Sequence, residues 1–436
     1  MSVNILTQNG LQRIHTVRVQ KDSKIIESDV NFYDYDGTLV NSYTKTEFLA
    51  LSALPPNPSH NGLTAQGWNW SLSDAKSYVN DYGKLNVGQM YITSDGKTRI
   101  YIHLEEGRLN PELNLTFVES GSFTVDWGDG TAIDTVSGEA DTFGTKTHAY
   151  SNGGDYIITI TVISGILSIE GKMTSSYSYL LKKANFTVEA ENKVYNNCIK
   201  SIEIGNNIKI GRYAFRDCRS LVSVMIPNQI TELGMEALSY CYSLVLVIIP
   251  NSITRLNSYV FQYSTGLTTV SLPSNLTEIG SYTLRGCISL MSITIPNSVT
   301  TIGREVLNGC NLLNCITIPN EITNLPSYFL GGCYTLETVT IPEDVTSIEG
   351  NVMSGLYSLS SITIPDEVTS IGKESFSGCQ GLGRITFKGE TPPTIASDTF
   401  KYLPTDCVIY VPRGSRSAYT SAQYYPNPNT YLYIEY

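Results

Sequence analysis

An Ile-Pro pair recurs every 23 residues through the second half of the chain. The pairs are Ile226-Pro227, Ile249-Pro250, Ile295-Pro296, Ile318-Pro319, Ile341-Pro342 and Ile364-Pro365. Leu272-Pro273 supplies the copy that is missing from the series, and Ile204 and Phe387 extend it at either end. A fixed period over nine copies is typical of a solenoid, in which each repeat packs against its neighbours.

Each copy reads Leu-x-x-Val/Ile-x-Ile-Pro, then Ile/Val-Thr-x-Ile/Leu, then an apolar residue and often Cys. One copy has at these positions Leu290, Ile293, Ile295, Val299, Ile302, Leu307 and Cys310. The Ile-x-Ile segment alternates as a half-buried strand does, and the proline ends the strand because it has no N–H to donate. One copy alone cannot bury its apolar residues, so the pattern predicts stacked repeats with a continuous core from about residue 199 to 396.

Six cysteines occupy one position of the repeat, namely Cys218, Cys241, Cys287, Cys310, Cys333 and Cys379. Ser264 and Leu356 stand at this position in two other copies. Because leucine cannot replace a metal ligand, we expect a structural ladder of small, buried side chains. Disulfide bonds and metal binding are the alternatives, and the chain has no Cys-x-x-Cys of the kind that binds zinc.

The unit Cys-x-x-Leu-x-x-Ile-x-Ile-Pro-x-x-Val-Thr-x-Ile-Gly-x-x-x-Phe resembles the BspA-like leucine-rich repeats of bacterial surface proteins. The tail, with Cys407-Val-Ile-Tyr-Val-Pro412 and Ser417-Ala-Tyr419, resembles the C-terminal cap of that family. The resemblance covers about half of the chain. It implies a leucine-rich-repeat solenoid and a role in adhesion to a host or partner surface.

A different pattern lies between about residues 108 and 162. Phe123-Thr-Val-Asp-Trp-Gly-Asp-Gly-Thr131 precedes His148-Ala-Tyr150 and an alternating segment, 154–162. This order resembles the polycystic-kidney-disease (PKD) domain, an immunoglobulin-like sandwich, which implies a spacer or weak binder on an extracellular protein. Asp126 and Asp129 offer oxygens that suit calcium, but we expect them to bond their own Gly turn, with His148 fixing that turn.

Near the N-terminus, Asp34-Tyr-Asp36-Gly-Thr-Leu39 matches the Asp-x-Asp-Gly-Thr signature of haloacid-dehalogenase-like phosphatases. That resemblance gives Asp34 the role of nucleophile and Asp36 that of acid/base, both beside a magnesium ion. The lead-in 28–33 alternates, however, whereas the motif needs a buried apolar strand. We therefore predict a β-hairpin that turns at Asp36-Gly37, and the phosphatase remains a remote alternative.

The rest of the first 105 residues is predicted to form a small α+β module. Thr44-x-x-Glu47 is a capping box for a short helix, and a second helix runs from about Ser73 to Asp81. Segments on either side of Asp95-Gly96 predict a second hairpin. Trp68 and Trp70 are expected to pack, with a carbohydrate platform as the alternative. Segments 32–38 and 62–70 resemble segments of virion or tail proteins of phages of gut bacteria.

Outward-facing strand residues are the usual binding surface of a solenoid. Most copies place Thr or Ser there, which suits either a solvated sheet or a hydroxyl array that binds glycan or protein. Two copies instead carry at these positions Val222, Met225, Val245, Leu246 and Ile248. Clustered apolar residues on a surface usually mark a contact. We predict that these five bind a partner or are covered by the β-sandwich or by the insert at 172–195.

Composition argues against several classes of protein. A net charge of −11 disfavours binding to nucleic acid. No stretch approaches the ~20 apolar residues of a membrane span. The first twenty residues lack the basic and apolar regions of a signal peptide, as expected for a protein that stays inside, leaves by another route, has lost its signal or joins a virion. The four histidines have no catalytic or metal-ligand spacing, so we assign no catalytic residue, metal or cofactor.

Together these patterns predict a mainly β protein, with a leucine-rich-repeat solenoid of 23-residue repeats preceded by an immunoglobulin-like PKD sandwich and a small α+β N-terminal module. The predicted parts are the module 1–105, the sandwich 106–165, a connecting segment or N-cap 166–198, the repeats 199–396 and a C-terminal cap 397–436. We expect a non-enzymatic recognition or display protein that binds protein or glycan on a cell surface, or other virion proteins. A phage virion is the expected location, and a bacterial cell-surface adhesin is the alternative.

Overall fold

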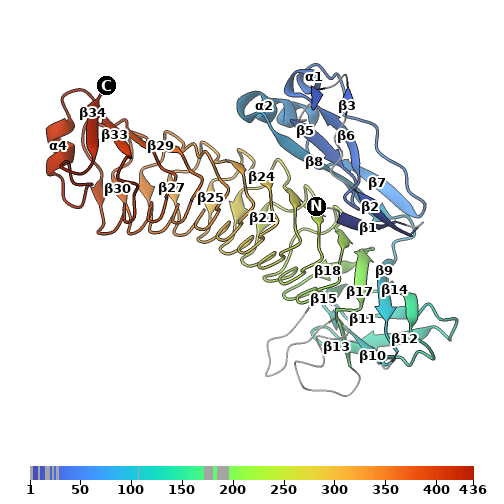
Figure 1. The fold of residues 1–436 in the computed structure, drawn as a ribbon. Helices are drawn as coiled ribbons and strands as arrows, with labels where there is room; N and C mark the ends of the chain where they lie inside the picture. The colour runs from blue at the N-terminus through green and yellow to red at the C-terminus, as the bar shows by residue number, and fades with distance from the viewer. Residues whose placement is uncertain are drawn as a thin grey trace.

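The computed structural model describes residues 29–106, 108–170, 180–183 and 196–436, together with four short strands that precede them. Those strands form two antiparallel pairs, β1 (Val3–Thr7) with β2 (Gly10–Ile14) and β3 (Gln20–Lys21) with β4 (Lys24–Ile25). Most of the insert at 172–195 lies outside the described residues. Figure 1 shows an N-terminal module and a sandwich near one end of a long solenoid, with the C-terminus at the other end.

The N-terminal module is a four-stranded sheet in the order β6-β5-β8-β7 with two helices. Its elements are β5 (Val30–Tyr33), β6 (Leu39–Tyr43), α1 (Lys45–Leu49), β7 (Leu63–Trp68), α2 (Leu72–Tyr82) and β8 (Leu85–Thr93). β5 is antiparallel to β6 and parallel to β8. Phe32, Phe48, Trp68 and Trp70 are buried in a core of its own, so the two tryptophans pack as expected.

Both helices of the module begin at side-chain caps. Thr44 and Glu47 form the predicted capping box at α1, and the Ser71 side chain accepts from the Asp74 N–H at α2. Gly83, with φ of 87°, follows the last turn of α2. The two predicted helices are therefore confirmed. None of the helices in the described part of the chain has the length and apolar character that crossing a bilayer requires.

The first predicted hairpin is confirmed, because β5 and β6 pair across the Asp36-Gly37 turn. The second is wrong: β8 pairs with β5 and β7, whereas β9 (Thr98–Leu104) pairs with β14 (Gly154–Ser164). Both segments alternate and flank a Gly turn, but pairing with distant strands outweighs this local signal. The Asp95-Gly96 turn thus leads from the module into the sandwich. Residues 98–104, predicted to belong to the module, are part of the sandwich.

The sandwich has two sheets with a shared core. The first runs β12 (Asp134–Gly138), β11 (Gly121–Asp126), β14, β9. The second runs β13 (Phe143–Thr147), β10 (Pro111–Phe117), β15 (Leu167–Ile169), and β16 (Leu181–Lys183) also pairs with β10. Phe117 of the second sheet packs against Phe123 of the first, with ring centroids 5.7 Å apart.

Two rows of short parallel strands build the solenoid. The first row is β17 (Ile199–Glu203), β19 (Ser223–Met225), β20 (Leu246–Ile248), β22 (Thr269–Ser271), β24 (Ser292–Thr294), β26 (Cys315–Thr317), β29 (Ser361–Ile364), β31 (Arg384–Phe387), β33 (Val408–Val411) and β34 (Leu432–Glu435). The second row is β18 (Ile208–Ile210), β21 (Arg255–Leu256), β23 (Glu278–Ile279), β25 (Thr301–Ile302), β27 (Asn324–Leu325), β28 (Ser347–Ile348), β30 (Ser370–Ile371) and β32 (Thr394–Ile395). Helix α4 (Arg416–Ser421) lies before β34. Pairs such as Ser361 with Arg384 are 23 residues apart, which confirms the predicted solenoid.

The sandwich closes the first end of the solenoid. β9 pairs with β17, and β15 pairs with β18, so each sheet of the sandwich continues into one row of the solenoid. Without this cap the first turn would present unpaired N–H and C=O groups to solvent. Residues 167–169, predicted to lie in a connecting segment or N-cap, form β15 of this cap.

The cysteine ladder lies in the solenoid core. The six side chains are fully buried free thiols. Where a thiol hydrogen bond is seen, Sγ donates to a carbonyl oxygen 26 residues earlier, as from Cys287 to Phe261 and from Cys310 to Leu284. Ser264 donates in the same way to the Leu238 carbonyl oxygen at 2.7 Å. The position therefore takes a small side chain with a donor, and in one turn the buried Leu356 fills it instead.

Candidate functional site

The outward face of the first row, called here the strand face, is divided into two parts. The predicted apolar residues lie on its first part, at β19 and β20 and just before them. Met225, Leu246 and Ile248 are only 2%, 4% and 6% exposed, and Val222 and Val245 are half-buried. Of the two predicted alternatives, a partner site or a cover from the chain itself, Met225, Leu246 and Ile248 have a cover, because another part of the same chain packs over them.

That cover is the N-terminal module. Strand β8 lies over β19, β20, β22 and β24 of the first row. Met90 of β8 forms a buried apolar cluster with Leu246 and Ile248, against which Tyr33 and Tyr35 also pack. Burying an aliphatic side chain of this size stabilises by about 1.5–3 kcal/mol. The sequence predicts the sandwich or the insert at 172–195 as the cover. The cover is instead strand β8 of the N-terminal module.

A glycine lets β8 approach the solenoid closely. A Cβ on Gly88 would lie 2.6 Å from both Cγ1 and Cγ2 of Ile248, which is closer than real Cβ contacts. The branched Ile248 side chain therefore occupies the space that any other residue at position 88 would need. Gly88 is a positioning residue for the docked module, and the sequence pattern around it contains no signal of this contact.

Polar contacts join the module to the solenoid beside the apolar cluster. The fully buried Asn69 donates from Nδ2 to Ser271 Oγ at 2.8 Å and accepts at Oδ1 from the Gly88 N–H at 2.8 Å. Trp70 donates from Nε1 to the Leu272 carbonyl oxygen at 2.7 Å. Ser271 Oγ donates in turn to the Asn86 carbonyl oxygen at 3.0 Å. These buried groups satisfy one another, so undocking would leave several of them without partners.

Helix α2 extends the contact toward β26. Ser274 Oγ donates to Asp74 at 3.1 Å. Burial raises the pKa of Tyr78, whose hydroxyl lies beside the side chains of Thr294 and Thr317 of the first row. The module therefore covers the strand face from β19 to β24 and reaches the border of β26.

The second part of the strand face remains open. It is defined here by the exposed side chains that follow β26, namely Thr338, Thr340, Ser361, Thr363 and Arg384. The residues that alternate with them, such as Val339 and Ile362, are buried in the core. This open strand face is a sheet of hydroxyl groups, with Arg384 packed over the ring of Tyr410 at its far end.

Carboxylates flank the open strand face. Residues 315–390 contain nine Asp and Glu against three Lys and Arg. Glu343, Asp344, Asp366 and Glu367 are exposed in the turns that follow the Ile-Pro pairs. Of the three cations, Lys388 is paired with Glu343. The surroundings of the hydroxyl surface are therefore strongly negative, which favours partners that carry cationic or neutral polar groups.

The Asp34-Asp36 motif forms the predicted hairpin turn. Asp34 is 4% exposed, and its Oδ2 lies 2.6 Å from His60 Nε2, while its Oδ1 accepts from the Tyr35 N–H. Asp36 accepts from the Thr38 N–H at 2.9 Å. Among the described residues, no group of three or more His, Cys, Asp or Glu is placed to hold a metal ion. These hydrogen bonds hold the turn that presents Tyr35 to the apolar cluster.

In the sandwich, the two aspartates bond their own turn as expected. Asp126 accepts from the Gly128 N–H at 3.0 Å, and Asp129 accepts from the Thr131 N–H at 3.1 Å. Asp129 also lies 2.7 Å from His148 Nε2. Burial acts to raise the pKa of Asp129, but hydrogen bonds from Thr131 and His148 outweigh it and lower the pKa to about 2. His148 therefore fixes the turn, as the sequence predicts.

Comparison with known proteins identifies the family to which the repeats belong. The model described as "BspA type Leucine rich repeat region (6 copies)" matches residues 189–314 and 309–412. No curated protein matches the chain. Among solved structures, a leucine-rich repeat protein from Bacteroides ovatus ATCC 8483 is 22% identical, with 56% of this chain and 69% of that chain covered and a TM-score of 0.42.

Two further solved structures are similar. The T. pallidum leucine-rich repeat protein TpLRR is 26% identical, with 42% of this chain and 83% of that chain covered and a TM-score of 0.36. The pneumococcal vaccine antigen PcpA is 19% identical, with 54% of this chain and 68% of that chain covered and a TM-score of 0.39. The family model spans residues 189–412, which is more than half of the 436 residues. The chain therefore belongs to the BspA-type leucine-rich repeat family.

Proposed function

We propose that this protein is a non-enzymatic recognition protein that binds a surface through the open strand face. The observation that carries the proposal is the division of the strand face. Its apolar part is occupied by the chain's own N-terminal module, through Met90 and the buried Leu246 and Ile248. Its hydroxyl part, from Thr338 to Arg384, is exposed. A repeat protein that leaves one continuous polar face free has a surface on which an extended partner can lie.

The chemistry of the open strand face indicates the kind of partner. Its hydroxyls both donate and accept hydrogen bonds, and the carboxylates around it attract positive charge. We therefore infer a protein or glycan partner with hydroxyl, amide or cationic groups, on a cell surface or on a neighbouring virion protein. The same acidic surroundings disfavour nucleic acid.

A pair of matched variants tests this surface. Thr340→Arg with Thr363→Arg places two bulky cations on the open strand face without entering the core. Thr346→Arg with Thr369→Arg makes the same change at exposed threonines of the second row. Binding of the labelled full chain to a panel of bacterial cells and purified matrix proteins should fall with the first variant and not with the second. Equal binding by both variants would contradict the proposal.

The location of the protein is also part of the proposal. The resemblance of segments 32–38 and 62–70 to phage structural proteins supports a virion. Membership of the BspA-type family supports the bacterial cell surface. Mass spectrometry of purified phage particles and of peptides released from intact cells by protease separates the two, because the chain should appear in one sample and not in the other.

We also propose that the sandwich is PKD-like and acts as a spacer that doubles as the cap of the solenoid. The Trp-Gly-Asp-Gly turn and the later His-x-Tyr of the PKD pattern contact each other, which supports the resemblance. Trp127 stacks on His148 with ring centroids 4.8 Å apart. The remote alternative, a phosphatase built on Asp34, has its own test. The protein should show no magnesium-dependent hydrolysis of phosphate monoesters, and an activity that disappears in Asp34→Asn would end the non-enzymatic proposal.

A further inference from the structure

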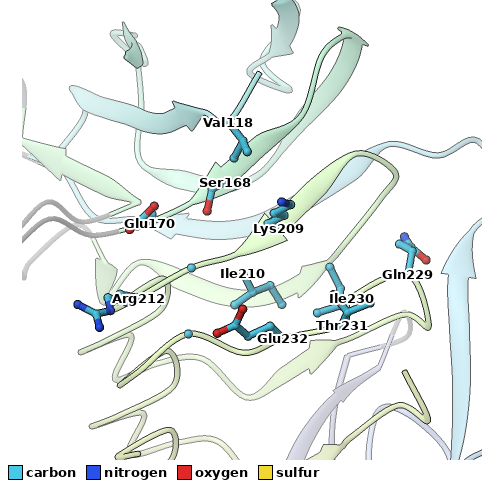
Figure 2. A pocket seen from close by; sticks show the side chains of 12 residues that line it. Val118, Ser168, Glu170, Lys209, Ile210, Arg212, Gln229, Ile230, Thr231 and Glu232 are labelled. Atoms are coloured by element: carbon cyan, nitrogen blue, oxygen red, sulfur yellow. The ribbon is translucent and has the colours of Figure 1, made fainter. Parts of the chain in front are cut away.

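A hollow of about 350 Å³ lies at the seam between the sandwich and the first two turns of the solenoid. It is lined by β15, by the end of β18 and by the second turn between residues 229 and 234. Figure 2 shows Glu170 and Arg212 at one end of the hollow and Gln229 at the other. Its volume lies at the lower end of the range for small-ligand sites, about 300–1,000 Å³.

The hollow interrupts the regular stacking of the second row. Lys209 and Glu232 hold the same repeat position in the first two turns, and Arg255 and Glu278 hold it in the next two. Arg255 and Glu278 form an ion pair at 2.8 Å. Lys209 and Glu232 line the hollow and form no ion pair with any residue in the described ranges. In the second row, these two turns are paired by an isolated bridge, Ile210 to Leu233, in place of a strand ladder. Glu232 Oε1 accepts from Asn257 Nδ2 at 2.8 Å, so the seam keeps one carboxylate and one ammonium group that no ion pair neutralises among the described residues.

The hydroxyl of Ser168 also points into the hollow. Ser168 of β15 is 3% exposed, and its side-chain oxygen is directed into the space between the sandwich and the first turn (Figure 2). No hydrogen-bond partner for this hydroxyl is present among residues 29–106, 108–170, 180–183 and 196–436. The hydroxyl lines the hollow, so it is available to bond a molecule that enters it. A ligand in the hollow would supply that bond.

We propose that this hollow binds one pyranose ring of a glycan. Its wall offers carboxylate acceptors in Glu170 and Glu232 and cationic donors in Lys209 and Arg212, so its formal charges balance. Adjacent hydroxyls of a sugar ring both donate and accept, which suits a wall that mixes the two. Ile210 and Ile230 line the hollow as well and give the C–H face of the ring an apolar surface. This site is separate from the open strand face and does not depend on it.

Saturation-transfer NMR on the full chain tests the site. The probes are methyl glycosides of a neutral hexose, an N-acetylhexosamine and a hexuronic acid, with free lysine as a non-sugar zwitterion. At least one glycoside should bind with the millimolar Kd expected of a ligand of about a dozen non-hydrogen atoms. Arg212→Ala and Glu232→Gln should each weaken that binding about tenfold, since each removes a hydrogen bond to a charged group.

Two further variants make the result decisive. Ser168→Ala removes only this hydroxyl and should weaken binding while the thermal unfolding midpoint is kept. Arg255→Ala changes the same repeat position two turns after Lys209, outside the hollow, and should leave binding unchanged. The proposal is overturned if no glycoside binds, if only lysine binds, or if Arg255→Ala weakens binding as much as Arg212→Ala does. Loss of binding in the strand-face variant alone would bear on the proposed function and not on this site.

Discussion

At the residue scale, the solenoid shows how a reactive residue type can serve only as packing. Cys287 and Cys310 donate to carbonyl oxygens of the preceding turn, and Ser264 makes the same bond. Burial raises the pKa of Cys333 and of Cys379 to about 12. A thiol in this environment is protonated at neutral pH and shielded from reagents, so it is chemically inert.

This inertness leads to a labelling prediction. In the folded protein at about pH 8, iodoacetamide should modify Cys315 first, because that thiol is half-buried on the strand face, while Cys333 and Cys379 stay unmodified. Peptide mass spectrometry after timed quenching measures the order, and labelling in urea provides the control in which every thiol reacts. Modification of the ladder cysteines at the rate of Cys315 would show that the core is not packed as described.

A second residue-scale prediction concerns acid. The pKa of Asp129 is lowered to about 2 in the folded chain, so its ionised form stabilises the fold. That stabilisation is complete above the usual carboxyl pKa of about 3.9 and is lost as the pH falls through about 2. Thermal unfolding of Asp129→Asn should therefore differ from wild type at neutral pH, and the difference should shrink between about pH 4 and 2. Asp126→Asn is the control, and a difference for Asp129→Asn that does not change with pH would refute the assignment.

At the element scale, partners that are distant in the sequence determine strand pairing more than the local sequence pattern does. The Thr44–Glu47 capping box and the β5–β6 hairpin depend on neighbours in the sequence, and the sequence predicts both correctly. The predicted hairpin at Asp95-Gly96 does not form, because β9 pairs with β14 and β17, which lie fifty or more residues further along the chain. Likewise, nothing near Gly88 reveals that β8 will cross the first row of the solenoid. Periodicity reports which face of a strand is buried, but not what buries it.

The close crossing of β8 gives a coupling prediction. Gly88→Ala should destabilise the docked module by about 1–3 kcal/mol, because the new Cβ overlaps the Ile248 side chain. Ile248→Ala removes the overlapping atoms, so the double variant should lose less than the sum of the two single losses. Calorimetric unfolding of the four proteins measures this coupling. Strict additivity would mean that the two residues do not touch.

At the scale of the whole molecule, the repeats were predictable because one unit is written nine times, and every copy repeats the same buried positions. The break in the Thr/Ser pattern was also visible, at Met225, Leu246 and Ile248. Its cause was not, since the residues that cover it come from a module more than a hundred residues earlier in the chain. The solenoid receives its own N-terminal module on one part of the strand face and leaves the other part exposed.

Hydroxyl-radical footprinting of methionines tests this arrangement most directly. Met90 and Met225 are each 2% exposed at the contact between module and solenoid, Met353 is fully buried in the core, and Met291 is 50% exposed. Met291 should oxidise quickly and the other three slowly. In the variant Leu246→Asp with Ile248→Asp, Met90 and Met225 should become reactive while Met353 stays protected. Oxidation of Met90 and Met225 in the wild-type protein as fast as that of Met291 would contradict the docked module.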